Sequence, residues 1–431
     1  MSGNLNIAIA GIGTVGGGVV KILSEAASLL EKRCGRKVVL KAVSSRDCGK
    51  ARDFKVGSDV KWYDDALALA DDKDIDVIVE LIGGADGIAL ELCEKSLNAG
   101  KHFITANKAL VAKHGKRLAE IAEQKKVAFA FEAAVAGGIP VIKVLKEGLV
   151  GNDFSRIAGI MNGTCNYILT EMKETGRSFA DVLKEAQDLG YAEADPSFDV
   201  DGIDTAHKLS ILTSIAFGVP VNFEAIYIEG IRELSLLDIS DAHELGYKIK
   251  LLGIAVKRDG VIKQSVYPCL VPVDYPLAKV DGVNNAIFIE GSYVGKIVLE
   301  GPGAGRGATA SAVLSDIIDV ASNRFTYPFG VPVGSLEKCN YTGVEKHKGE
   351  YYLRITALDE AGILAGISDI LRDEEISVES LLQKPVKKGD NANIVVITHS
   401  CTENSVKKAV TRIAKIKGVV NAPKVLRIES V

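Results

Sequence analysis

The feature that most constrains the fold is a glycine-rich turn near the N-terminus, in the stretch IAIAGIGTVGGGVVKILSEA. Apolar residues before the turn predict a buried strand, and the apolar spacing after it predicts a helix. The glycines match G-x-G-x-x-G, a pattern that allows a tight turn, close approach of a pyrophosphate and tight packing of helix on strand. This turn therefore predicts a dinucleotide site, formed by Gly11, Ile12, Gly13, Thr14, Val15 and Gly16.

Strands and helices alternate through the first 132 residues. The stretch DIDVIVELIGG predicts a buried parallel strand, and GIALELCEKSLNAG predicts a helix that ends at a glycine. KHFITANKALVAKHGKRLAEIAEQKK predicts a short strand, a polar turn and a helix. This alternation predicts an α/β fold with a Rossmann-like, doubly wound parallel sheet.

The strand KVVLKAVSSRD indicates which dinucleotide is bound, because an acidic residue at its end usually holds the ribose hydroxyl of NAD. Here the strand ends at Arg46, with Lys50 close by, and an arginine suits the 2′-phosphate of NADP. Asp47 follows at once, so NAD stays an alternative, and Arg46 could equally be a surface cation. NADP is the prediction.

The turn TANKAL lies at the carboxyl end of another strand, where such sheets bind ligands. Thr105 and Lys108 are therefore candidates for contact with the cofactor or the substrate. The alternative for Lys108 is a solvated lysine, which is disfavoured at a helix start because its charge opposes the helix dipole.

The composition is that of an ordinary globular protein, with 47% apolar and 25% charged residues in a chain of 431. This length predicts two or three domains. The net charge of −4 gives no reason to expect nucleic acid as a partner. We find no apolar run that suits a membrane span and no signal peptide, so no membrane association is expected.

Seven cysteines are scattered along the chain without a C-x-x-C pair. This pattern argues against a zinc site or a disulfide framework. It is typical of reduced thiols, and it predicts a cytoplasmic protein.

An acid-rich segment, EADPSFDVDGIDTAHK, runs from Glu193 to Lys208 and could be a solvated loop or a pocket for a small cationic substrate. We expect an irregular loop followed by a helix that begins near Asp201, a good N-cap. Asp204 and Lys208 are then four residues apart on one helix face, in the favourable order for an ion pair. Because the helix continues as the apolar LSILTSIAFG, Lys208 is predicted to lie at the mouth of a buried helix.

Two later turns carry glycines before a predicted helix. In MNGTCN, Gly163 and Thr164 could present N–H groups to an anion, or the turn could be ordinary helix capping by Asn162 or Thr164. In GPGAGRGATASAV, Gly303 and Gly305 either return the chain to the cofactor or form a plain hinge between domains.

The last eighty residues have a pattern of their own. Residues 326–350 are linker-like, and the following segments predict the order β-α-β-β-α-β, which is a ferredoxin-like fold.

Together these motifs resemble the homoserine dehydrogenase family with a C-terminal ACT domain. GIGTVGGG, TANK, MNGT, EADPSFDVDGIDTAHK and GPGAGRGATASAV occur in the order that the family shows, and DEAGILAGISDIL is similar to an ACT opening. The resemblance covers nearly the whole chain. It implies a nucleotide-binding domain at 1–132 completed by about 302–325, an α+β substrate and dimerisation domain at 133–301, and an ACT domain at 351–431.

The activity implied by the resemblance is NAD(P)-dependent interconversion of L-homoserine and L-aspartate 4-semialdehyde, in threonine, methionine and isoleucine biosynthesis. Glu193 would take the ammonium group of this zwitterionic substrate. The other substrate-binding residues would be Gly163, Thr164, Tyr191 and Asp199.

Proton transfer must accompany the hydride transfer, and Lys208 and Lys108 are both candidates for it in this family. We expect Lys208 to be the acid–base group, positioned by Asp204, and Lys108 to orient the reacting oxygen, although the two roles could be exchanged. The resemblance also implies a sodium ion held by backbone carbonyls, at Glu132, Val135, Gly137 and Ile139. It further implies threonine as an ACT effector and a homodimer or homotetramer.

Two other functions remain open. NGTCN is similar to the cysteine loop of phosphorylating aldehyde dehydrogenases, in which Cys165 would be a nucleophile that forms a thioester. Alternatively, the ACT-like tail could make the chain a non-catalytic amino-acid sensor.

Overall fold

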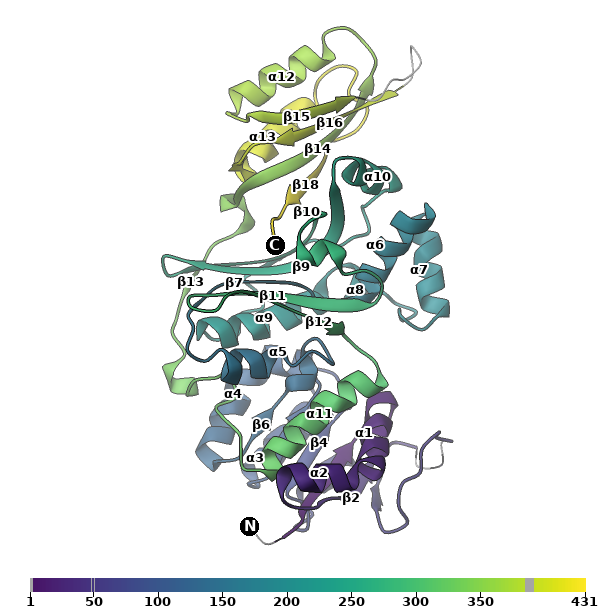
Figure 1. The fold of residues 1–431 in the computed structure, drawn as a ribbon, viewed down its shortest axis with the longest axis vertical. Helices are drawn as coiled ribbons and strands as arrows, with labels where there is room; N and C mark the ends of the chain where they lie inside the picture. The colour runs from purple at the N-terminus through teal and green to yellow at the C-terminus, as the bar shows by residue number, and fades with distance from the viewer. Residues whose placement is uncertain (1–2, 48, 50, 384–390) are drawn as a thin grey trace.

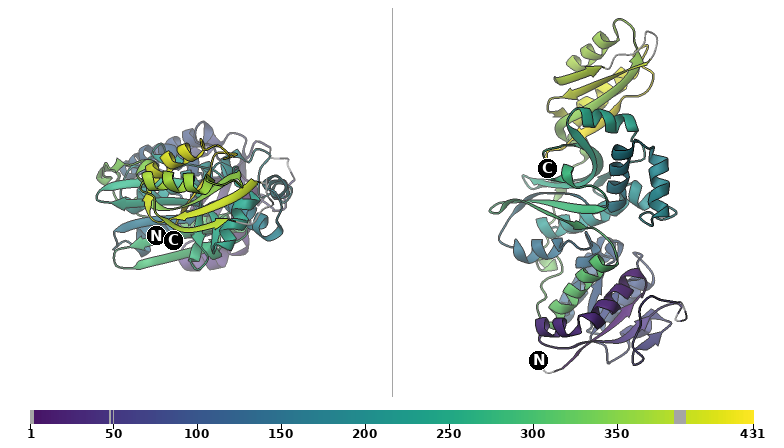
Figure 2. Two further views of the ribbon diagram at one scale, coloured as in Figure 1. Left: turned by 90° about the horizontal axis from the view of Figure 1, so that it is seen from above. Right: turned by 45° about the vertical axis from the view of Figure 1, so that its right-hand side comes forward.

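The structure is a computed structural model that describes residues 3–47, 49, 51–383 and 391–431. Figure 1 shows three parts that follow one another along the long axis, with the N-terminal part at one end and the C-terminal part at the other. The second view in Figure 2 shows the same succession. Within the described residues, no helix has the length and apolar character that crossing a bilayer requires.

The N-terminal part is a parallel sheet in the order β3-β2-β1-β4-β5-β6, so the strand order reverses between β1 and β4. Such a reversal is where doubly wound sheets bind ligands. The strands are β1 (Leu5–Ala10), β2 (Val38–Ser44), β3 (Lys61–Tyr63), β4 (Val77–Glu80), β5 (His102–Thr105) and β6 (Phe129–Ala130). The helices are α1 (Thr14–Glu25), α2 (Ala27–Cys34), α3 (Ile88–Asn98) and α4 (Lys108–Lys125). The predicted Rossmann-like fold is confirmed.

The three glycines of the first turn differ in why a side chain is absent. Gly11 has a φ of +97°, and a Cβ there would lie 2.7 Å from the carbonyl oxygen of Leu81. A Cβ on Gly16 would lie 2.2 Å from the carbonyl oxygen of Gly11, so α1 packs tightly against the end of β1. At Gly13, by contrast, nothing lies within 4 Å of a Cβ position. Gly13 therefore leaves the approach to the helix start open.

The middle part is a mixed sheet with helices on one face. Its strands are β7 (Phe154–Ile160), β8 (Ile226–Ile228), β9 (Tyr247–Arg258), β10 (Val261–Pro272), β11 (Asn284–Gly291) and β12 (Gly295–Pro302). Its helices are α5 (Val141–Lys143), α6 (Gly163–Thr175), α7 (Phe179–Asp188), α8 (Ser197–Val200), α9 (Ile203–Phe217) and α10 (Leu236–Glu244).

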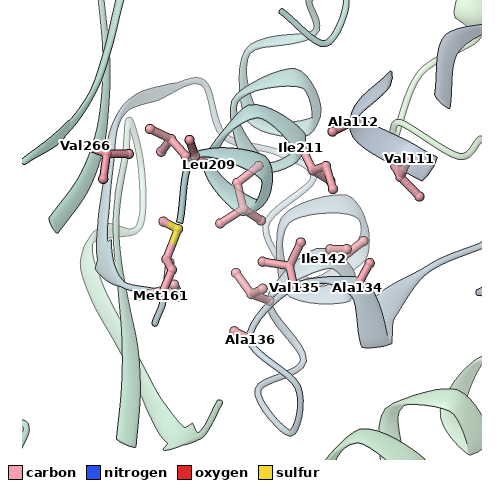
Figure 3. Packing of buried hydrophobic residues seen from close by; sticks show 14 of the residues in the cluster. Val111, Ala112, Ala134, Val135, Ala136, Ile142, Met161, Leu209, Ile211 and Val266 are labelled. Atoms are coloured by element: carbon pink, nitrogen blue, oxygen red, sulfur yellow. The ribbon is translucent and has the colours of Figure 1, made fainter. Parts of the chain in front are cut away.

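Helix α9 lies directly on this sheet. A Cβ on Gly253 of β9 would be 3.0 Å from the side chain of Thr205 and 3.4 Å from the Met161 sulfur, so the glycine permits the close approach. Met161 and Leu209 belong to the large apolar cluster that Figure 3 shows in part. This packing fixes α9, and with it the position of the acid-rich segment.

The C-terminal part is the predicted ferredoxin-like unit, and its sheet is joined to the middle one. Its elements are β14 (Lys348–Leu358), α12 (Ile363–Asp373), β15 (Val378–Gln383), β16 (Asn391–Thr398), β17 (Cys401–Thr402), α13 (Glu403–Ile413) and β18 (Lys424–Ile428), preceded by β13 (Asn340–Tyr341), which pairs with β10. Strand β18 lies between β14 and β10, where Cys269 pairs with Arg427 and Leu270 with Ile428. The two parts therefore share one continuous sheet.

After β12 the chain returns to the first part as α11 (Arg306–Ala321), which packs against α1 (Figure 1). A Cβ on Gly18 of α1 would lie 2.7 Å from the carbonyl oxygen of Arg306, so the absence of a side chain at Gly18 lets the two helices approach.

One local prediction in the acid-rich segment is wrong. Residues expected to be irregular include the short helix α8, and α9 begins at Ile203 with Gly202, not Asp201, as its N-cap. The carboxylate of Asp201 instead pairs with the guanidinium of Arg232. Gly202 has a φ of +85°, which turns the chain sharply between α8 and α9.

Candidate active site

Three ionisable side chains meet where α4 and α9 begin. The Oδ2 atom of Asp204 lies 2.7 Å from Nζ of Lys208, and its Oδ1 atom lies 2.9 Å from Nζ of Lys108. Lys108 is the first residue of α4, and Asp204 lies in the first turn of α9. One buried carboxylate is therefore shared by two lysines, one from the nucleotide-binding part and one from the middle part.

The surroundings move the two lysine pKa values in opposite directions. Burial lowers the pKa of Lys208, a shift that Asp204 opposes and Lys108 reinforces. For Lys108 burial acts the same way, but the charge of Asp204 outweighs it and raises the pKa. Burial would also raise the pKa of Asp204, yet the two lysines hold it well below its usual range. Lys208 is thus the amine that loses its proton more readily.

A loop between β7 and α6 holds this cluster in place. The carbonyl of Met161 accepts a hydrogen bond from Lys208 at 2.6 Å. The side-chain amide of Asn162 donates to Asp199 at 2.8 Å and to Asp204 at 2.9 Å. Burial, then the charge of Asp204, raises the pKa of Asp199. Asn162 therefore keeps two carboxylates together beside Lys208.

The predicted substrate residues lie around this loop. The hydroxyl of Thr164 donates to the carbonyl of Tyr191 at 2.7 Å, so the start of α6 is tied to the acid-rich segment. The ring of Tyr191 packs edge-on against Tyr167. Gly163 begins α6, and Asn162 is its N-cap through a bond to the backbone N–H of Cys165. The expected capping is therefore present, and the N–H groups of Gly163 and Thr164 lie at the same helix start.

Glu193 is exposed, and its negative charge contributes to the raised pKa of Lys108. The Nζ atom of Lys108 also lies 5.4 Å from the ring centre of Phe198, a cation–π contact. The exposed face of this cluster is thus bordered by an exposed carboxylate and an aromatic ring.

A buried carboxylate organises the strand ends where Thr105 lies. Glu80, at the end of β4, accepts from the backbone N–H groups of Ile82 and Gly83 and from the hydroxyl of Thr105. The Thr105 hydroxyl in turn accepts from the N–H of Asn107, the N-cap of α4. This chain of bonds fixes the turn that begins α4, and so the position of Lys108.

The end of β2 carries a second guanidinium beside Arg46. Arg46 is exposed, and Arg52 donates to the hydroxyl of Ser45 at 2.9 Å and lies 5.2 Å from the ring centre of Trp62. Asp47 bonds to the backbone N–H of Gly49. Lys50, also predicted to contact the cofactor, lies outside the described residues.

Gly303 and Gly305 lie at the junction between the middle sheet and α11. Gly305 is the N-cap of α11 and has a φ of +118°. A Cβ on Gly137 would lie 2.5 Å from the carbonyl oxygen of Gly303, so this turn packs against the segment EAAVAGGIP. This position fits both a return of the chain to the cofactor and a hinge between domains. The turn crosses from the middle part to the N-terminal part and ends at α11, beside α1.

The segment expected to hold sodium is a strained turn. Ala136 and Gly137 have φ values of +55° and +48°. The carbonyls of Glu132 and Ile139 each accept a backbone N–H, from Val135 at 3.4 Å and from Val141 at 2.8 Å. Since a carbonyl oxygen has two lone pairs, each can still coordinate a cation. The backbone oxygens of this turn are the ligands that hard cations prefer, so the residues fit the ion.

Cys165 is unsuited to nucleophilic catalysis. It is fully buried, and burial raises the pKa of its thiol well above the usual value. Its sulfur lies 3.3 Å from the carbonyl oxygen of Asp199, to which it donates. A reactive thiol is ordinarily partly exposed and has a lowered pKa.

Sequence reasoning missed four groups at this site: Glu80, Arg52, Phe198 and the carbonyl of Met161. Of these four groups, only Glu80 could have been found from the sequence. A carboxylate that ends an otherwise apolar strand needs hydrogen-bond donors when it is buried.

Comparison with known proteins follows the same division of the chain. Residues 11–132 match the family model for the NAD-binding domain of homoserine dehydrogenase, 140–318 match homoserine dehydrogenase and 351–418 match the ACT domain. A homoserine dehydrogenase from Neisseria gonorrhoeae is 44% identical over 99% of both chains. One from Bacillus subtilis is 38% identical over 93% of this chain and 92% of its own.

Solved structures of homoserine dehydrogenases are also similar to this chain. The crystal structure of a homoserine dehydrogenase from Thiobacillus denitrificans has a TM-score of 0.93 at 41% identity and covers 99% of both chains. A hyperthermophilic archaeal homoserine dehydrogenase in complex with NADPH has a TM-score of 0.64 at 30% identity, covering 76% of this chain and all of its own. With its nucleotide-binding, middle and ACT parts all matched, the chain belongs to the homoserine dehydrogenase family, the NAD(P)-dependent oxidoreductases that act on a CH–OH group.

Proposed function

We propose that the Lys108–Asp204–Lys208 cluster catalyses the interconversion of L-homoserine and L-aspartate 4-semialdehyde. The observation that carries the proposal is the sharing of one buried carboxylate by two lysines from different parts of the chain. When bound, the nicotinamide cofactor supplies the chemistry of hydride transfer. The chain's own task is then to hold the substrate and to move one proton.

Lys208 is the acid–base group in this proposal. In the oxidation of homoserine it accepts the proton of the C4 hydroxyl, and in the reverse direction it returns that proton to the carbonyl oxygen. Its lowered pKa supports the assignment, because burial makes the charged amine less stable and so eases the exchange of a proton. Lys108, whose raised pKa keeps it charged, orients the reacting oxygen.

The zwitterionic substrate needs acceptors for its ammonium and donors for its carboxylate. We assign the ammonium to Glu193, which is exposed beside Lys108. The pocket is completed by Gly163, Thr164, Tyr191 and Asp199. In support, the bond from Thr164 to the Tyr191 carbonyl holds these elements side by side.

NADP is the proposed cofactor, bound at the turn of Gly11 to Gly16 with Thr105, Lys108, Gly303 and Gly305 nearby. Two guanidiniums at the end of β2, on Arg46 and Arg52, support a 2′-phosphate. Arg46→Ala should weaken binding of NADP far more than binding of NAD. Equal weakening of both would contradict the assignment.

The turn at residues 132–140 is proposed to hold a structural sodium ion through the carbonyls of Glu132, Val135, Gly137 and Ile139. The positive φ of Ala136 supports this, since such strain persists only where the surroundings impose it.

The remaining proposals concern assembly. We divide the chain at residues 132, 301 and 350 as the sequence predicts, with 302–325 completing the first domain, as the packing of α11 on α1 supports. The ACT domain would bind an amino-acid effector, threonine by family resemblance, in a homodimer or homotetramer. The free cysteines at 34, 93, 165, 269, 339 and 401 support a cytoplasmic location.

The deciding experiment is reduction of NADP by the purified protein with L-homoserine. We expect NADPH formation that needs homoserine and does not need phosphate. Phosphate-dependent acylation would favour the thioester chemistry of Cys165, and effector binding without turnover would favour a sensor. The fully buried thiol and the full-length matches to dehydrogenases argue against both.

A further inference from the structure

A buried side-chain amide lies between the proposed substrate and cofactor segments without a hydrogen-bond partner. Asn285 is 1% exposed, and both its Nδ2 and its Oδ1 atoms are unpaired. No other buried asparagine among the described residues has both amide atoms unpaired. Buried polar groups are almost always paired, and exceptions point to a role that the protein atoms alone do not fulfil.

The position of Asn285 is set by strand β11. Its neighbour Ala286 is paired with Ile160 of β7, one residue before Met161, whose carbonyl binds Lys208. Since side chains alternate along a strand, Asn285 shares a face with Ile287, which belongs to the apolar cluster of α9. Asn285 therefore points to the side of the sheet that carries the active site.

Two glycines enclose this amide. A Cβ on Gly303 would lie 2.1 Å from Nδ2 and 2.4 Å from Oδ1 of Asn285, so glycine is required to leave room for the amide. A Cβ on Gly163 would lie 3.7 Å from Oδ1. The amide thus lies where the turn that leads to α11 meets the start of α6.

We propose that Asn285 is a positioning residue that binds the carboxamide of the nicotinamide ring and so fixes the ring beside Lys208. The inference rests on the nicotinamide cofactor of the proposed function. The chemistry of the unpaired atoms selects the ligand: a primary carboxamide offers a donor and an acceptor and can satisfy both. A carboxylate offers acceptors alone and would leave Oδ1 unpaired.

Gly303 covers the amide in this structure, so the carboxamide reaches it when residues 302–305 move aside. This movement breaks the hydrogen bond from the N–H of Gly138 to the carbonyl of Pro302, and Gly303 and Gly305 lack the side chains that would restrict it. Cofactor binding is then coupled to the position of the turn that begins α11.

The test uses Asn285→Leu, which keeps the branched shape of the side chain without its polar atoms, and Asn285→Ala in case the larger leucine prevents folding. NADPH and 2′-phospho-ADP-ribose, which lacks the nicotinamide ring, are titrated into the full-length protein. We expect NADPH to bind about tenfold more weakly to either variant, a change of about 1.4 kcal/mol, because its two hydrogen bonds are lost. Binding of 2′-phospho-ADP-ribose should stay unchanged.

The unfolding midpoint without ligand separates this role from a structural one. It should not fall in Asn285→Leu, because an unpaired amide costs stability when buried. The matched control is Asn166→Ala, which removes a buried amide that is fully paired with Val280, Asn284 and Lys250. This control should lower the midpoint and leave the ratio of the two affinities unchanged.

Three results would overturn the proposal: unchanged NADPH affinity, equal weakening of both ligands, or a raised KM for homoserine with NADPH affinity intact. The last would assign Asn285 to the substrate instead. Turnover of homoserine by the unaltered protein is independent of all three, so failure here leaves the proposed function standing.

Discussion

Asp204 and Arg427 are both buried charged groups, and each holds two partners of opposite charge. Asp204 joins Lys108 and Lys208 where the nucleotide-binding part meets the middle part. Arg427, on β18, binds Glu403 through two nitrogens at 2.6 and 3.0 Å and Glu229 through a third at 3.0 Å, where the ACT domain meets the middle part. It also lies 4.4 Å from the ring centre of Tyr267.

The two clusters differ in whether one of their groups is left able to exchange a proton. Around Arg427 every guanidinium nitrogen is paired, and although burial opposes it, the hydrogen bonds and charge of Glu403 raise its pKa further. Around Asp204 one carboxylate is shared by two lysines, and burial, reinforced by the charge of Lys108, leaves Lys208 with a lowered pKa. A saturated cluster can only hold the structure together, whereas an unsaturated one can exchange a proton.

The largest expected effect is on turnover, from Lys208→Met. The change keeps a long buried side chain but removes the proton acceptor, so kcat should fall at least about a thousandfold, about 4 kcal/mol, with NADPH affinity intact. Initial rates of homoserine oxidation and a fluorescence titration measure the two quantities. Lys250→Met, which removes another buried lysine paired with Asp281, is the control and should retain turnover. Survival of activity in Lys208→Met would remove the distinction between the clusters.

The next effect is on stability, from Arg427→Met. Breaking the cluster leaves the buried Glu403 without its guanidinium partner, so the free energy of unfolding should fall by about 3–5 kcal/mol, while kcat without effector is retained. Urea unfolding measures the loss. The exposed Arg372, which pairs with Asp369 and Asp373, gives the control Arg372→Met, which should leave the urea midpoint almost unchanged. A similar small loss for Arg427→Met would show that its cluster is not structural.

A smaller effect depends on pH and concerns His347, at the same joint. Burial, then the charge of Lys263, lowers its pKa from the ordinary value of 6.5 to about 4. Between these values the unfolded chain binds a proton that the folded one does not, so stability falls as the pH is lowered from 6.5 to 4. His347→Phe should remove this part of the pH dependence, about 1–3 kcal/mol. An unchanged slope of urea midpoint against pH would contradict the buried, neutral imidazole.

The smallest effect is expected from Cys165→Ser, beside the active-site cluster. Because the thiol is buried and only donates to the Asp199 carbonyl, the hydroxyl can replace it and homoserine oxidation should barely change. Steady-state rates test this. A loss beyond about a thousandfold, some 4 kcal/mol, would make Cys165 part of the chemistry.

Much of the fold was predictable because its signals are local. The glycine turn at Gly11, the apolar helix after Lys208 and the ferredoxin-like order each lie within one short segment. The start of α9 could not be predicted in this way. Asp201 pairs with Arg232, thirty-one residues away, and so does not cap the helix.

The site was predictable where side chains lie on one helix, as Asp204 and Lys208 do. Contacts between separate elements were not predictable: Lys108 was expected at the site, but its pairing with Asp204 was not, and neither was the contact of Arg52, in the loop after β2, with Trp62 of β3. Such contacts depend on the packing of whole elements, which no periodicity in the sequence records.

The placement of β18 between β10 and β14 has a consequence for biosynthesis. Strand β8 covers Gln264–Val266 of β10, but Cys269 and Leu270 leave the ribosome well over a hundred residues before the strand that pairs with them, so the nascent middle domain exposes this part of the strand edge throughout that interval. Pairing across so long a stretch of chain is slow. Completion of the shared sheet is therefore expected to be the late step of folding, and the one most dependent on chaperones.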